Sequence, residues 1–312
     1  MSLLEGLNPQ QSAAVTHSGS PLLVVAGAGS GKTRVLTRRI AYLLAERNVA
    51  PYEILAITFT NKAANEMKER VITLVGNRAK AMWVSTFHSA CVRILRSEAA
   101  ALGYSNSFTI YDASDSLRLV TLVMKDMNLD PKRYNSRAIA GLISDAKNEL
   151  IGPADFVQNV KNQFDEIVAE VYAHYQKRLT SANAMDFDDL IGKTVELLQR
   201  HPEIRAKYRS RFKHILVDEY QDTNHAQYVL IRELVGVGYD GLPPAELCVV
   251  GDADQSIYAF RGANIRNILQ FEADFTDAKT ILLEQNYRST QNILSAANSV
   301  ISNNENRKAK NL

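Results

Sequence analysis

The sequence is poor in the residues that build disulfide frameworks, metal clusters and membrane spans. Only two of its 312 residues are cysteines, Cys91 and Cys248, and their spacing suits neither a disulfide framework nor a zinc site. No apolar run approaches the roughly 20 residues that cross a bilayer. The N-terminus lacks the basic segment and long apolar segment of a signal peptide. We therefore expect a cytoplasmic protein with no membrane partner.

A strong charge of one sign is missing as well. The formal net charge is +2, so bulk charge neither requires nor excludes a nucleic-acid partner. A hydrophobic content of 46% and a charged content of 22% are those of an ordinary globular protein. At 312 residues the chain is near the size at which chains divide into domains.

Short apolar runs recur between segments that are long enough for crossover helices. Runs rich in Ile, Val and Leu and bounded by polar residues are typical of buried parallel strands. They occupy residues 22–26, 54–59, 82–85, 215–218, 247–250 and 281–283. The alternation predicts an α/β fold with a doubly wound parallel sheet flanked by helices.

The segment 103–185 has a different pattern, because its apolar residues recur with a helical period in 117–127 and 164–179. We predict an all-helical subdomain inserted between strands of the sheet. Residues 186–190, which follow it, contain three aspartates and raise the alternative of a metal or nuclease site. The acidic first turn of a helix over 190–198 is the simpler interpretation.

A glycine-rich loop follows the first apolar run and precedes a helical pattern. Residues 26–33 match the phosphate-binding pattern G-x-x-x-x-G-K-[ST] except at the first position, Ala26. Backbone N–H groups of such a loop surround phosphates, its lysine reaches the β- and γ-phosphates, and its hydroxyl binds Mg²⁺. We therefore predict ATP and Mg²⁺ as cofactors, bound by Ala28, Gly29, Ser30, Gly31, Lys32 and Thr33.

Two further polar clusters follow apolar runs. Asp218 and Glu219 end the run at 215–218, where a P-loop protein holds Mg²⁺ with the Asp and activates water with the Glu. An acidic helix start is the alternative. After the run at 247–250, Gln255 has the chemistry to sense a γ-phosphate, and Tyr258 and Phe260 to stack on bases. A polar loop with two core aromatics explains that cluster equally well.

Together these segments resemble the superfamily 1 DNA helicases of the UvrD/Rep/PcrA type. The resemblance covers essentially the whole chain, with the motifs in family order. The matching segments are 7–11 (Q motif), 26–33 (P-loop), 57–64 (Ia), 85–89 (Ib), 217–224 (II), 251–263 (III) and 283–290 (IV). It implies a RecA-like motor domain 1A over 1–102 and 186–285, a helical insertion 1B over 103–185, and the start of a second motor domain over 286–312.

The resemblance also implies roles for individual residues. Gln11 would recognise the adenine, with Arg34 and Tyr287 on either side of the ring. Gln255 would couple the γ-phosphate to DNA, and Arg288 would act as an arginine finger. The residues implied to line a single-strand path are Phe59, Thr86, His88, Tyr258 and Phe260.

The implied function is that of the N-terminal part of an ATP-dependent 3′→5′ helicase, acting on single-stranded and 3′-tailed duplex DNA. Two departures bear on it. Ala259 and Phe260 stand where the family usually has Arg and Trp. No segment of the 312 residues resembles the family's motifs V and VI, so we expect little turnover from this chain alone.

Two other functions remain as alternatives. A P-loop phosphotransferase accounts for Lys32 and Asp218, but it gives no role to Gln255, Tyr258 and Phe260. A DNA-binding module that uses nucleotide without turnover is the second. Stimulation of ATP hydrolysis by single-stranded DNA separates the first from a helicase, and steady-state turnover separates the second.

Overall fold

The computed structural model describes residues 2–236, 241–256 and 262–302. The chain divides into two compact units. Unit 1 comprises Met1–Phe87, Ala206–Thr223 and Leu234–Leu312, and unit 2 comprises His88–Arg205 and Asn224–Glu233. The segment 103–185 lies wholly within unit 2.

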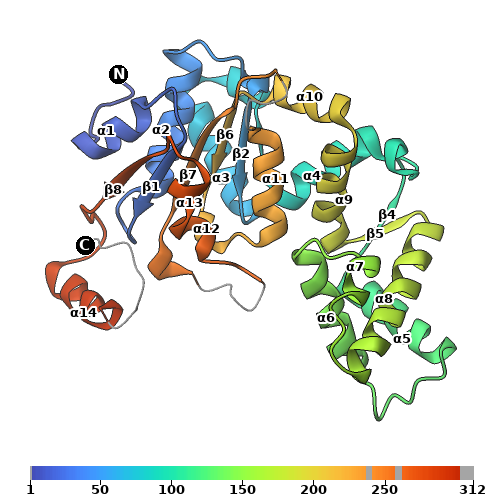
Figure 1. Ribbon diagram of the computed structural model, residues 1–312. Helices are drawn as coiled ribbons and strands as arrows, with labels where there is room; N and C mark the ends of the chain where they lie inside the picture. Colours follow the sequence, from blue (N-terminus) through green and yellow to red (C-terminus); the bar gives the residue numbers. More distant parts are fainter. Residues whose placement is uncertain (1, 237–240, 257–261, 303–312) are drawn as a thin grey trace. The chain divides into compact units, whose positions relative to one another are not determined.

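Unit 1 is built on one parallel sheet, which confirms the predicted α/β class (Figure 1). The strand order is β3-β2-β6-β7-β1-β8, and every described pair is parallel. The strands are β1 (Leu22–Ala26), β2 (Ile54–Thr58), β3 (Trp83–Thr86), β6 (His214–Val217), β7 (Glu246–Gly251) and β8 (Lys279–Leu283). Each of the six predicted runs corresponds to one of these strands, with ends that differ by at most two residues.

Helices cover both faces because the strands are apolar on both sides. Alternate strand residues such as Val24 and Val250 join a core with helices α1 (Pro9–Thr16), α2 (Lys32–Ala45) and α3 (Asn61–Val75). On the other face, Tyr220 packs edge-to-face on Phe271, with ring centroids 5.8 Å apart. The remaining elements described in unit 1 are η1 (Pro51–Glu53), η2 (Asn77–Ala81), η4 (Tyr220–Asp222), η5 (Ala253–Gln255), α12 (Arg266–Leu269), α13 (Phe271–Asp274) and α14 (Gln291–Ile301).

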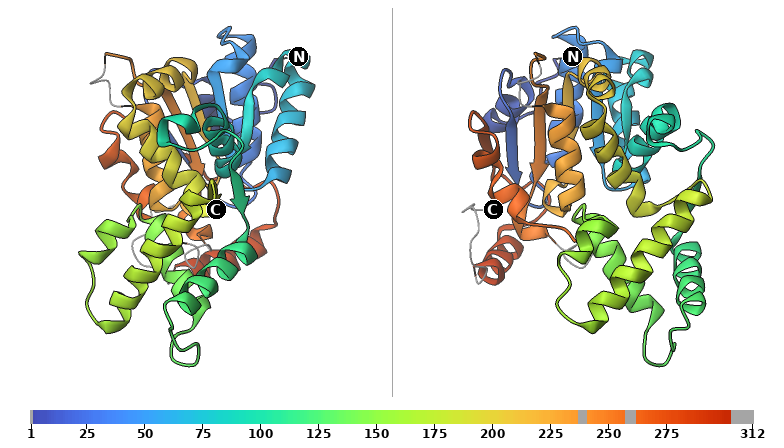
Figure 2. Two further views of the ribbon diagram at one scale, coloured as in Figure 1. Left: turned by 90° about the vertical axis from the view of Figure 1, so that its right-hand side faces the viewer. Right: turned by 45° about the vertical axis from the view of Figure 1, so that its right-hand side comes forward.

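Unit 2 is mainly helical, and several of its helices share a second core (Figure 2). The apolar spacing read in the sequence lies in α5 and α8, whose buried residues include Val120 and Tyr175. The helices are α4 (Phe87–Glu98), η3 (Ala99–Leu102), α5 (Ala113–Asp126), α6 (Ser136–Asn148), α7 (Pro153–Val157), α8 (Gln163–Ser181) and α9 (Phe187–Arg200). Helix α4 and helices α10 (Pro202–Arg211) and α11 (His225–Val235) each contain a boundary between the units. None of the described helices is long and apolar enough to span a bilayer.

Unit 2 also holds two short strands that the sequence did not predict. Strands β4 (Thr109–Tyr111) and β5 (Ala184–Asp186) pair in parallel, so the insertion is not purely helical. Three residues are too few to show an alternating pattern. The pairing continues past the strand end, where the N–H of Thr109 donates to the carbonyl of Asn183 at 2.9 Å.

Candidate functional site

The glycine-rich loop joins the carboxyl end of β1 to the start of α2. Gly29 and Gly31 have φ values of 72° and 90°, a region that side chains disfavour. A Cβ on Gly31 would also lie 2.8 Å from Nε2 of Gln11. The Ser30 hydroxyl closes the loop by donating to the carbonyl of Gly27 at 2.7 Å. The helix therefore begins with backbone N–H groups directed at the loop, as an anion site needs.

Lys32 is placed to receive a phosphate. Its Nζ is buried and has no hydrogen-bond partner among the described residues. The nearest counter-charge is Glu219, whose Oε2 lies 3.5 Å away. A buried ammonium without hydrogen bonds is unfavourable, and the phosphates of a nucleotide would supply them. Together with the loop, this ammonium fits ATP.

Asp218 and Glu219 follow β6, beside the loop. Burial and the charge of Glu219 raise the pKa of Asp218 to about 6. The N–H of Glu219 donates to Asp218 Oδ1 at 3.0 Å. Glu219 has a φ of 49°, which is uncommon for a residue with a side chain, and that side chain is 39% exposed. A buried carboxylate near the hydroxyl-bearing start of α2 has the hard oxygen chemistry that Mg²⁺ prefers, and a bound cation would keep Asp218 ionised.

Gln11 is fully buried in α1 and is fixed by the loop. Its Nε2 donates to the carbonyl of Ser30 at 2.9 Å, and its Oε1 accepts from the N–H of Asn8 at 3.1 Å. Asn8 in turn donates to the Tyr287 hydroxyl at 3.0 Å. The Q motif is therefore attached to both the P-loop and the segment after β8.

Three of the predicted nucleotide residues lie on the exposed side of the loop. The N–H of Tyr287 donates to the carbonyl of Gly29 at 2.9 Å, and its ring is exposed. Arg288 is so close to the loop that a Cβ added to Gly29 would lie 2.6 Å from the Cβ of Arg288. Arg34 is exposed on the first turn of α2. The chain thus returns after β8 to the loop that follows β1.

The residues predicted for the DNA path fall in different places. Phe59 is half-buried beyond β2, and its ring packs edge-to-face on Phe87 with centroids 5.9 Å apart. Thr86 ends the neighbouring strand β3, where Thr58 is its partner in register. Tyr258 and Phe260 lie outside the described residues.

Beside His88 lies an aromatic residue, Phe187, that the sequence analysis did not identify. The ring of His88 lies 4.3 Å from that of Phe187, both in unit 2, and Phe187 is 53% exposed. Burial lowers the pKa of His88 to about 4, so the imidazole is neutral at pH 7. The available signal was one aromatic residue among three aspartates at a helix start.

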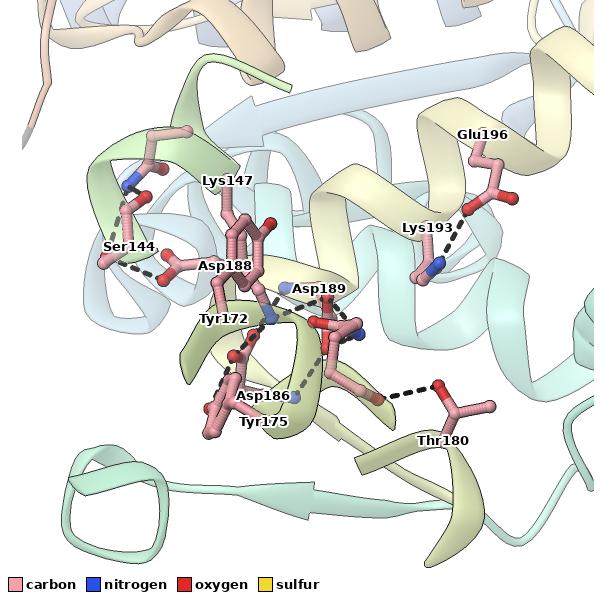
Figure 3. Close-up of polar contacts among 12 residues, drawn as sticks. Ser144, Lys147, Tyr172, Tyr175, Thr180, Asp186, Asp188, Asp189, Lys193 and Glu196 are labelled. Carbon is pink, nitrogen blue, oxygen red and sulfur yellow. Dashed lines mark hydrogen bonds and ion pairs between the residues drawn. The ribbon is translucent and has the colours of Figure 1, made fainter. Parts of the chain in front are cut away.

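The three aspartates of residues 186–190 lie at the start of α9, as predicted, and two of them form ion pairs with a lysine. Asp186 is the N-cap, and its side chain accepts from the N–H of Asp189 at 2.8 Å. Lys147 Nζ lies 2.6 Å from Asp186 and 2.9 Å from Asp189 (Figure 3). Burial alone would lower the pKa of Lys147, but the charges of the two carboxylates outweigh burial and raise it. No metal-binding group of three or more His, Cys, Asp or Glu occurs in the described part of the chain.

Comparison with known proteins agrees with this geometry. Residues 7–276 match the family model described as the UvrD/REP helicase N-terminal domain. The chain is 65% identical to "ATP-dependent DNA helicase UvrD1" of Mycobacterium tuberculosis and 56% identical to "ATP-dependent DNA helicase PcrA" of Bacillus subtilis. Each match covers 99% of this chain but 41% of the relative. The chain belongs to the UvrD/Rep helicase family.

Proposed function

We propose that this chain is the N-terminal part of an ATP-dependent 3′→5′ DNA helicase. The observation that carries the proposal is the buried Lys32 ammonium, which lies beside the P-loop with Glu219 3.5 Å away and no hydrogen-bond partner among the described residues. The proposed domains are 1A over 1–102 and 186–285, 1B over 103–185, and the start of the second motor domain over 286–312. The matched residues 7–276 include segments of both described units.

The chain's own residues account for ATP hydrolysis. The loop amides and the start of α2 hold the phosphates, while Lys32 leaves Glu219 for the β- and γ-oxygens. Thr33 and Asp218 would hold Mg²⁺, which neutralises phosphate charge when bound. Glu219 then accepts the proton of the attacking water. Arg288, beside Gly29, adds positive charge to the transition state.

We propose that single-stranded DNA contacts the aromatic and polar residues that the family resemblance implies, together with Phe187. Phe59 follows β2, and Thr86 ends the neighbouring strand β3. The ring of His88 packs on the exposed ring of Phe187. Neutral His88 contributes a hydrogen bond and a stacking surface, not a charge. Single-stranded and 3′-tailed duplex DNA are the expected substrates, and the cytoplasm is the expected location.

ATP hydrolysis with and without single-stranded DNA tests the proposal in the full-length protein. Stimulation by DNA is expected, together with loss of ATP binding in Lys32→Ala. Unstimulated transfer of phosphate to a small acceptor would favour a phosphotransferase. ATP and DNA binding without turnover would favour a non-enzymatic module.

A further inference from the structure

Gln221 lies two residues beyond the proposed general base and is 1% exposed. Its Nε2 donates to Oε2 of Glu219 at 2.9 Å, and its Oε1 accepts from the N–H of Asp252 at 2.9 Å. A carboxylate only accepts and a backbone N–H only donates, so the two partners allow one orientation of the amide. The side chain therefore joins the end of β6 to the end of β7.

The contact leaves the two oxygens of Glu219 in different environments. Lys32 and Gln221 both approach Oε2. No residue in the described ranges donates a hydrogen bond to Oε1, and the Glu219 side chain is 39% exposed. If Lys32 turns to a bound phosphate, the hydrogen bond from Gln221 is the contact of Oε2 that remains among the described residues.

The other end of the contact reaches the segment that carries Gln255. Asp252 accepts from the Gln255 side chain and, at 3.0 Å, from the N–H of Asp254. Gly251 permits the close approach, because a Cβ there would lie 2.7 Å from Oε1 of Gln221. A continuous chain of contacts thus runs from Lys32 through Glu219, Gln221 and Asp252 to Gln255.

We propose that Gln221 is a positioning residue for ATP hydrolysis. It holds Oε2 of Glu219 so that Oε1 faces the attacking water, and it ties this orientation to the backbone at Asp252. The inference rests on the proposed function, since it needs Glu219 to act as the base. It assigns Gln221 no contact with ATP itself.

The test compares Gln221→Met, Glu219→Gln and the double variant in the full-length protein. Methionine has a similar volume and removes both of these hydrogen bonds, as well as the longer one of 3.4 Å from Nε2 to Oδ2 of Asp222. We expect kcat to fall roughly 10- to 100-fold, while KM for ATP changes by no more than about twofold because uniform binding is kept. The double variant should be no slower than Glu219→Gln, because Gln221 acts through that carboxylate.

Asn267→Leu is the matched control. Asn267 is another buried amide in unit 1, and it donates to the carbonyl and the hydroxyl of Thr223, both at 3.0 Å. We expect it to lower the melting temperature as Gln221→Met does, with kcat kept. If Gln221→Met melts below the assay temperature, Gln221→Glu replaces it, since glutamate still accepts from Asp252 but cannot donate while ionised.

The outcomes separate the two proposals. Unchanged kcat in Gln221→Met, or a further loss in the double variant, would overturn the positioning role and leave the proposed function intact. Normal turnover in Glu219→Gln would show that another group takes the proton, and it would overturn the positioning role as well. Absence of DNA-stimulated ATP hydrolysis in the unaltered full-length protein would instead overturn the proposed function.

Discussion

Lys32 and Glu219 form an ion pair across the proposed active site, 3.5 Å apart. Binding of ATP has to separate them, because the ammonium belongs with the phosphates and the carboxylate with the water. The pair therefore neutralises both groups until substrate arrives. The two residues should consequently have separable effects on binding and on chemistry.

We expect Glu219→Gln in the full-length protein to keep ATP binding and to lower turnover roughly 10²- to 10⁴-fold, the usual effect of losing a general base. Lys32→Ala should weaken binding itself. Titration with a fluorescent ATP analogue and steady-state phosphate release measure the two effects. Near-normal turnover in Glu219→Gln would show that another group takes the proton.

A second residue-scale prediction concerns Phe187. Because its ring is exposed, Phe187→Ala should weaken single-strand binding by about 1–3 kcal/mol per stacked base lost, with little change in melting temperature. Phe260→Ala should act in the same direction. His88→Gln should leave the salt dependence unchanged, because a neutral imidazole releases no counterion. Anisotropy of a labelled oligonucleotide at several salt concentrations measures all three, and a large loss of stability with unchanged affinity would make Phe187 a packing residue.

The pKa of Asp188 predicts a pH effect on stability. Burial and the charge of Asp186 raise it to about 6, although Ser144 donates to Asp188 at 2.7 Å. Because the pKa of Asp188 is higher in the folded state, its contribution to the free energy of unfolding is full below the pKa of the unfolded chain. That contribution is lost as pH rises through about 6. Asp188→Asn does not titrate, so its stability relative to the wild type should increase between about pH 4 and about pH 7.

Urea denaturation of this chain at several pH values measures that difference. Asp145→Asn removes an exposed carboxylate from α6 and controls for the loss of one negative charge. A difference between Asp188→Asn and wild type that stays constant with pH would contradict the prediction.

At the scale of elements, Lys147 ties α6 to the start of α9. Removing one member of a buried ion pair leaves an uncompensated charge and typically costs about 3–5 kcal/mol. Lys147→Ala leaves Asp186 and Asp189 facing each other, so we expect a loss of stability of that order. The midpoint of urea denaturation measures it, with exposed Lys177→Ala as the control. Equal midpoints for the two variants would show that the carboxylates find other partners.

The same elements show what the sequence could and could not predict. The strands of unit 1 were predictable because buried parallel strands are apolar on both faces. The P-loop was predictable because its glycines, lysine and threonine are adjacent in the chain. Strands β4 and β5 escaped notice because each has three residues. The roles of Lys147 and Gln221 were not predicted because Asp186 lies 39 residues from Lys147, and Asp252, the second partner of Gln221, lies 31 residues from it.

At the scale of the whole molecule, the chain spans 41% of the relatives that it matches. An arginine finger contributes about 10³- to 10⁵-fold to turnover, and Arg288 is the one that this chain would supply. We therefore expect the 312-residue chain to hydrolyse ATP barely above background, with or without DNA. Phosphate release at saturating single-stranded DNA tests this, and robust stimulated turnover would show a self-sufficient motor.

The place of β1 in the sheet also sets a timetable for biosynthesis. Strand β1 (Leu22–Ala26) pairs with β7 and β8, which end at Gly251 and Leu283. It pairs with none of the strands β2 to β6, which precede β7 in the sequence. At a translation rate of about 5–20 residues per second, the first of these neighbours is made roughly 10–50 s after β1. During this time the five apolar residues of β1 have no native strand partner at either edge. Unpaired strand edges are templates for pairing with other chains. We therefore expect the glycine-rich loop after β1 to be among the last parts of unit 1 to form during synthesis.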